Sequence, residues 1–166
     1  MGSIRSHCID FHTNPPLPPG TQYDFRISPL PLMLNGLNFS VIVSTATAYQ
    51  IPNSPQSVKT AQINAHFDTG ASITSIDIEL AKHLNLIPVG ETPSNTAAGL
   101  RMATNFVIDL SFPGGSLRAF RNLPISSCNL GGPSMPLKFS MLLGRDVMSC
   151  WNIVWDGPSS TVIISD

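Results

Sequence analysis

Asp68, Thr69 and Gly70 are the residues of this sequence best suited to carry out chemistry. The carboxylate follows directly after an apolar segment that ends at Phe67, and the glycine two positions later lets the chain turn sharply. Such a turn lifts an acid out of a rigid sheet into a cleft, where it can take part in acid–base chemistry. The same triplet also fits an aspartate that caps a turn through its side chain.

The segment before this turn has the pattern of a half-buried strand. In residues 59–67, apolar and polar side chains alternate with a period of two, which places them on opposite faces. One face holds Ala61, Ile63, Ala65 and Phe67, and the other holds Gln62, Asn64 and His66.

The rest of the chain is expected to be mainly β, either a barrel or a sandwich. Residues 75–85 are the best helix, because Ile76, Leu80 and Leu84 share one face and Ser75 or Asp77 can cap it. A turn at 113–115 predicts a hairpin between 105–112 and 117–125. Further strands are expected at 37–44, 141–143 and 161–165, and a short helical turn at 145–149.

The 166 residues suffice for one domain with an added tail. Residues 1–35 form a proline-rich arm, since the prolines in 14–20 exclude a helix or a central strand. This arm is either a segment that covers the surface of the domain or a proline-rich ligand that another protein recognises. The domain itself is expected to span residues 36–166.

Composition excludes several function classes. The net charge is −1 and the nine basic residues are scattered, so the sequence has no basic patch that could bind nucleic acid. No apolar run reaches the roughly 18–20 residues of a membrane span, and no signal peptide is visible. We therefore expect a cytoplasmic protein without nucleic-acid or membrane partners. Charged residues are only 11% of the chain, which hints at an extensive buried subunit contact.

No metal or cofactor is expected. The three cysteines, Cys8, Cys128 and Cys150, fit neither a disulfide framework nor a zinc site. The four histidines also lack the spacing of metal ligands.

Two motifs and the segment between them resemble the retropepsin-like aspartic proteases over about residues 58–166. The first motif is 68–72, which reads Asp-Thr-Gly-Ala-Ser and is followed by the helix pattern. The second is Leu142-Leu143-Gly144-Arg145-Asp146, similar to the family's apolar-apolar-Gly-Arg motif before a short helix. Between them, Thr96, Ala97, Ala98 and Gly99 fall where the family has its flap. The resemblance implies a mainly β, closed barrel with one principal helix, acting as a homodimer.

Aspartic proteolysis needs two carboxylates that share one proton, because two like charges in contact cannot both ionise. This chain has a single Asp-Thr-Gly and is too short for two lobes. The second carboxylate must therefore come from another copy, with Asp68 facing its mate across a twofold axis. The implied activity is that of a homodimeric endopeptidase that hydrolyses peptide bonds with an activated water.

The resemblance also implies roles by position. Thr69 would hydrogen-bond across the dimer axis, and Gly70 would permit the turn and offer its carbonyl to the substrate backbone. Ala71 matches the retroviral type. The segment from Thr96 to Gly99 would close over a polypeptide bound in extended form.

Three positions depart from the retroviral pattern or leave alternatives open. Ser72 stands where those enzymes carry a second aspartate that pairs with the arginine of the later motif. Arg145 therefore either needs another partner, for which Asp146 and Asp109 are candidates, or lies in a different position. His66 either lies on a solvated strand face or lines the cleft, where it would make the pocket polar and shift the pH profile.

Two other functions remain open at the level of sequence. The same cleft can hold a peptide without cutting it, which would make the chain a catalytically silent interaction module. Alternatively, the arm over 1–35 is an inhibitory pro-segment that the enzyme removes by self-cleavage.

Overall fold

The computed structural model describes residues 3–7, 36–46, 48, 59–96, 99–115, 117–130, 139–158 and 161–166. The expected arm over 1–35 lies outside these residues, apart from Ser3–His7. The described part is mainly β, as the sequence predicts.

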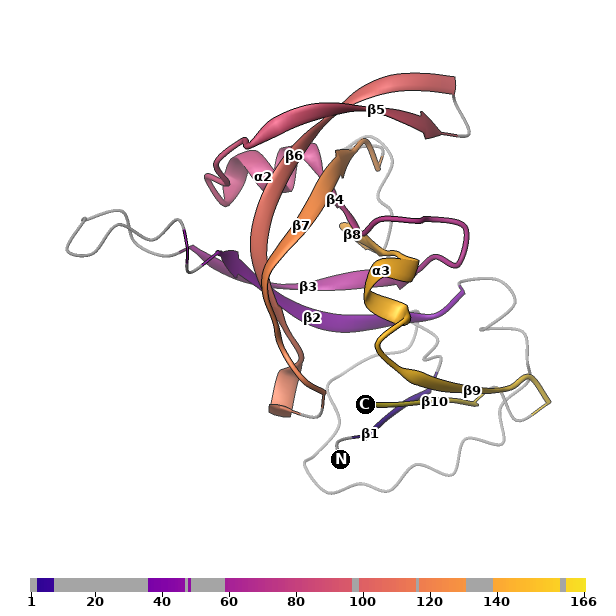
Figure 1. The fold of residues 1–166 in the computed structure, drawn as a ribbon. Helices are drawn as coiled ribbons and strands as arrows, with labels where there is room; N and C mark the ends of the chain where they lie inside the picture. The colour runs from indigo at the N-terminus through magenta and orange to yellow at the C-terminus, as the bar shows by residue number, and fades with distance from the viewer. Residues whose placement is uncertain are drawn as a thin grey trace.

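Six strands close into a barrel (Figure 1). Each strand is hydrogen-bonded to the next, and the ring closes because Ile42–Thr45 also pair antiparallel with residues 108–111. In order around the ring, the strands are β2 (Asn38–Thr45), β3 (Thr60–Phe67), β8 (Met141–Leu143), β4 (Ser75–Asp77), β7 (Phe120–Cys128) and β6 (Gly99–Ser111). The structure thus has the expected closed barrel rather than a sandwich.

The barrel interior is filled by the apolar faces of these strands. On β3, Ala65 and Phe67 are buried whereas Gln62 is exposed, which confirms the predicted alternation. Val41 and Val43 on β2 are fully buried in the same core. Because the side-chain period of a strand is two, this pattern sets the register of β2 against β3.

The expected helix over 75–85 is only partly correct. Ser75–Asp77 form strand β4, which lies between β7 and β8, and the helix α2 runs from Ile78 to His83. Hydrogen bonds to two neighbouring strands outweigh the helical preference of these three residues. Ile76 is fully buried all the same, because its side chain faces the barrel core.

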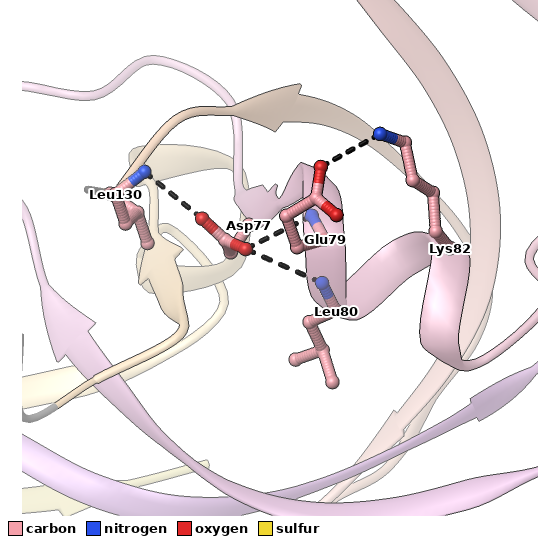
Figure 2. Close-up of polar contacts among 5 residues, drawn as sticks. All are labelled: Asp77, Glu79, Leu80, Lys82 and Leu130. Atoms are coloured by element: carbon pink, nitrogen blue, oxygen red, sulfur yellow. Dashed lines mark hydrogen bonds and ion pairs between the residues drawn. The ribbon is translucent and has the colours of Figure 1, made fainter. Parts of the chain in front are cut away.

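Asp77 marks the point where strand changes to helix, and it is the N-cap of α2. Its Oδ1 accepts hydrogen bonds from the amides of Glu79 at 3.0 Å and Leu80 at 3.3 Å (Figure 2). Its Oδ2 accepts another from the amide of Leu130, at 3.0 Å. One carboxylate therefore starts the helix and fixes the end of β7 against it.

A second, smaller sheet lies below the barrel in Figure 1. It has the order β1 (Ser3–His7), β10 (Thr161–Ser165) and β9 (Asn152–Asp156), all antiparallel. The sequence predicts β10 but neither of its neighbours. Helix α3 (Arg145–Met148) connects β8 of the barrel to this sheet.

Strand β5 (Gly90–Thr96) lies outside the closed ring and pairs with the first half of β6. The hairpin between β6 and β7 turns through the 3-10 helix η2 (Pro113–Gly115), where Gly114 has a φ of 77° that favours glycine. No helix in the described residues is long and apolar enough to cross a membrane.

We predict that Asp77→Ala lowers the free energy of unfolding by about 1–2 kcal/mol, the usual range for a lost N-cap. Urea denaturation measures this. The matched control is Glu79→Ala, which removes only the exposed ion pair with Lys82 at 2.7 Å and should cost less than about 0.5 kcal/mol. Equal losses in the two variants would contradict the role given to Asp77.

Candidate functional site

The turn after β3 holds the Asp68 carboxylate in a defined position. The amide of Ala71 donates to the Asp68 carbonyl at 3.2 Å, which closes the turn. The amide of Gly70 donates to Asp68 Oδ1 at 2.8 Å. Asp68 is half-buried, whereas Thr69 and Gly70 are exposed. The carboxylate is thus oriented by backbone but still reaches the surface.

The second motif, 142–146, lies directly beside this turn. Strand β8 runs parallel to β3, with Phe67 opposite Leu143. The amide of Asp68 donates to the Leu143 carbonyl at 3.1 Å, and the amide of Arg145 donates to the Ala71 carbonyl at 3.0 Å. The structure therefore brings together the two motifs that the sequence separates by more than seventy positions.

Arg145 binds the turn through backbone carbonyls. Its Nη1 donates to the Thr69 carbonyl at 2.7 Å and to the Gly70 carbonyl at 3.2 Å. Neither candidate partner from the sequence fills this role: Asp109 pairs with Arg121 at 2.8 Å, and Asp146 binds Thr74. Position 72 is a serine and offers no carboxylate, and the Arg145 guanidinium binds the main chain of the turn.

Asp146 connects the start of α3 to the segment that follows the turn. Its carboxylate accepts hydrogen bonds from the Thr74 amide, at 2.9 and 3.0 Å, and from the Thr74 hydroxyl, at 2.8 Å. The Thr74 hydroxyl also accepts from the Gly144 amide at 3.1 Å. Thr74 is fully buried, so these bonds satisfy polar groups that water cannot reach.

Thr74 is the functional-site residue that sequence reasoning missed. A lone threonine in a polar stretch carries no recognisable pattern, and its partner lies far away in the chain. The signal that finds it is the half-buried carboxylate of Asp146, which requires donors nearby.

Gly144 lies where two backbones meet. A Cβ at this position would be 2.6 Å from the Ile73 carbonyl carbon and 2.7 Å from the Thr74 nitrogen. Real Cβ atoms do not approach backbone atoms this closely, so only glycine fits. The glycine of the second motif therefore allows its close contact with the segment after the turn.

His66 lies on the outer face of the barrel, since its strand neighbours Ala65 and Phe67 point into the core. Its ring stacks on Phe139, with centroids 4.7 Å apart, and its Nδ1 lies 2.9 Å from Asn38 Oδ1. The ring is half-buried, so the face is not simply solvated. Burial lowers the pKa of His66, and the nearby charge of Asp68 opposes this effect.

The expected flap is part of an exposed hairpin. Thr96 ends β5 and Gly99 begins β6, and the Thr96 hydroxyl donates to the Gly99 carbonyl at 2.9 Å. Ala97 and Ala98 lie outside the described residues. Figure 1 shows this end of the hairpin on the same side of the molecule as the loop after β3. Leu100 and Met102 on β6 are 74% and 61% exposed, so the hairpin carries apolar side chains that do not pack into the barrel core.

No group of three or more His, Cys, Asp or Glu side chains within the described ranges could hold a metal ion. Cys128 is a structural residue, because its thiol donates to the Ile76 carbonyl at 3.5 Å. Burial, together with the charge of Asp77, raises the pKa of this thiol to about 12, so it stays protonated at neutral pH.

Comparison with known proteins finds no matching family model and no matching curated protein. Among solved structures, the chain is similar to EIAV protease complexed with the inhibitor HBY-793, at 13% identity and a TM-score of 0.45. That match covers 78% of this chain and 93% of the other. A retropepsin-like aspartic protease from Rickettsia conorii is similar at 15% identity and a TM-score of 0.44, covering 77% of this chain and 91% of the other.

We predict that Gly144→Ala lowers the free energy of unfolding by about 2 kcal/mol or more, since the added methyl group overlaps backbone atoms. Thermal or urea denaturation measures the loss. Gly157→Ala is the matched control: the nearest atom to its Cβ would be Trp155 Nε1 at 3.8 Å, an ordinary contact. A Gly144→Ala chain as stable as this control would show that the close approach is not required.

A pH effect follows from the lowered pKa of His66. Below its ordinary value of 6.5, the unfolded chain binds a proton that the folded chain still excludes. The free energy of unfolding should therefore fall as the pH drops below about 6.5, because proton binding favours the unfolded state. In His66→Gln this contribution is absent, so urea denaturation at pH 7.5 and 5.5 should give a smaller difference. An equal or larger difference in the variant would contradict this prediction.

Proposed function

We propose that this chain is an aspartic endopeptidase of the retropepsin type that acts as a homodimer. The observation that carries the proposal is the Asp68 turn, which is locked by backbone hydrogen bonds to the 142–146 motif. A rigid, partly accessible carboxylate is what general acid–base chemistry requires.

The second carboxylate is that of Asp68 in another copy. The chain contains a single Asp-Thr-Gly, and one carboxylate cannot both activate a water and protonate a peptide carbonyl oxygen. Two Asp68 side chains in contact would share one proton, since both cannot be charged at that distance. The ionised partner takes a proton from the trapped water, which attacks the peptide carbon. The protonated partner donates to the carbonyl oxygen.

The hydrogen bonds of the turn suit these roles. Gly70 holds only one carboxylate oxygen of Asp68, Oδ1, through its amide. Thr69 is exposed beside it, where its hydroxyl can reach a facing copy of the same turn. The Gly70 carbonyl accepts one bond from Arg145 and keeps a second lone pair for a substrate amide. Ala71 and Ser72 complete the turn and lead to the buried Thr74.

The substrate is a polypeptide bound in extended form beneath the β5–β6 hairpin. An extended chain pairs its backbone with a neighbouring strand, and alternate side chains enter pockets. The segment from Thr96 to Gly99 closes over it, and the exposed Leu100 and Met102 give the hairpin an apolar surface. Closure excludes water other than the reacting molecule.

A reducing compartment such as the cytoplasm fits the free thiols of Cys128 and Cys150.

The direct test is hydrolysis of casein or a peptide library between about pH 4 and 7, with a pepstatin-type inhibitor as a check. Asp68→Asn removes the ionisable group but keeps the shape of the turn, so turnover should fall by at least about a thousandfold. Sedimentation velocity should show the same dimer as the original chain. Asp77→Asn is the matched control and should keep full activity.

Activity that survives in Asp68→Asn would rule out this mechanism. Binding of peptides without any hydrolysis by the original chain would instead identify a silent interaction module.

A further inference from the structure

Three segments of the chain hold the imidazole of His66 in one orientation. The ring stacks on Phe139, with centroids 4.7 Å apart, and its Nδ1 lies 2.9 Å from Asn38 Oδ1. Gly36 lies against the opposite edge of the ring, where a Cβ would be 2.5 Å from Cε1 of His66. Because Gly36 also has a φ of 63°, glycine suits this position in two ways. The ring is thus fixed on the face of β3 that points away from the barrel core.

The contact with Asn38 determines which ring nitrogen of His66 carries the proton. A carboxamide oxygen only accepts hydrogen bonds, so Nδ1 is the donor in this contact. In the neutral imidazole the other nitrogen, Nε2, then keeps its lone pair and acts as an acceptor. Burial lowers the pKa of His66, which favours this neutral form near pH 7. Among the residues that the structure describes, none donates a hydrogen bond to Nε2.

His66 and Asp68 lie on the same side of the chain. Side chains two positions apart in an extended segment point to the same face, about 6.5 Å from each other along the strand. The amide of Asp68 donates to the Leu143 carbonyl, which continues the pairing of β3 with β8 as far as Asp68. The carboxylate is close enough for its charge to oppose the effect of burial on the pKa of His66. The His66 ring therefore lies beside the group to which the proposed function assigns the chemistry.

A row of side chains continues from His66 across the neighbouring strands on this face. Leu142 on β8 is opposite His66, and Ser75 on β4 is opposite Leu142. Ser126 on β7 follows, with its Oγ 3.5 Å from Ser75 Oγ. Residues directly opposite each other on paired strands point to the same face of a sheet. The surface beside Asp68 therefore has an apolar side chain at its centre and polar groups at both ends.

We propose that His66 is a specificity-determining residue, whose Nε2 accepts a hydrogen bond from the substrate side chain next to the cleaved bond. This inference rests on the proposed function, in which Asp68 marks the position of that bond. Residues of an extended substrate are about 3.3 Å apart, so the side chain beside the cleaved bond reaches the surface between Asp68 and His66. The favoured side chain is uncharged, with a short apolar stem over Leu142 and a hydrogen-bond donor at its end, as in asparagine, glutamine or threonine.

Other side chains fit this surface less well. A carboxylate finds no proton on Nε2 of His66 and is repelled by the charge of Asp68. An aliphatic side chain fills the space over Leu142 but covers Nε2 without supplying a hydrogen bond, so an acceptor that solvent can reach loses its partner. His66 therefore discriminates through the penalty on the aliphatic side chain as well as through the bond to the donor.

Paired peptides test this preference. Two peptides based on a site that the chain cleaves in casein would differ only in asparagine or leucine beside the cleaved bond, which have similar shapes. At pH 7 the original chain should cleave the asparagine peptide with a kcat/KM at least about fivefold higher. In His66→Leu the ratio should fall to one or below, and this ratio does not depend on how much of the variant is folded. Gln62→Leu is the matched control and should keep the original ratio, because Gln62 lies on the same face of β3 but farther from Asp68.

Binding without turnover provides a second readout. In Asp68→Asn, the asparagine peptide should bind with a Kd at least about fivefold lower than the leucine peptide, and only the asparagine peptide should shift the ¹⁵N NMR signal of His66 Nε2. Equal cleavage of the two peptides by the original chain, or a preference that His66→Leu retains, would overturn the role of His66 and leave the proposed function intact. No cleavage of casein or of a peptide library by the original chain would overturn the proposed function and this role together.

Discussion

The connection between the turn at 68–72 and the motif at 142–146 determines the rest of this structure. Backbone hydrogen bonds join Asp68 to Leu143 and Arg145 to Ala71, and the Arg145 guanidinium adds two more bonds to the turn. Gly144 makes this contact possible because no side chain fits between the two backbones. The main chain of the Asp68 turn is consequently held by the second motif, and the Gly70 amide orients the carboxylate, which is the preorganisation that acid–base catalysis needs.

The proposed chemistry needs a second carboxylate beside Asp68, because one group cannot both activate the water and protonate the carbonyl oxygen. Under the proposed mechanism, the single Asp-Thr-Gly turn of each chain requires the Asp68 carboxylate of a second copy. The low share of charged residues, 11%, is consistent with a chain that buries apolar surface between subunits. The single Asp68 and the low charge content are thus the two features of the chain that favour the proposed homodimer.

Sequence reasoning identified what depends on local pattern. Alternation predicted β2 and β3, and a three-residue apolar run predicted β8. It failed where residues far away in the sequence determine the local structure. Ser75–Asp77 are a strand because β7 and β8 lie on both sides of them, although their apolar spacing continues that of a helix. The partners of Arg145 are main-chain carbonyls, which no side-chain pattern reveals. Thr74 is important only because it donates hydrogen bonds to the Asp146 carboxylate, which lies far away in the sequence.

The most direct measurement is a crystal structure of the dimer, from which the separation of the two Asp68 carboxyl groups can be read. A homodimeric aspartic protease requires carboxyl oxygens of the two copies within hydrogen-bonding distance, roughly 2.6–3.2 Å apart, or bridged by one water. We predict that arrangement across a twofold axis. Two Asp68 side chains on separate surfaces of the dimer would contradict the account.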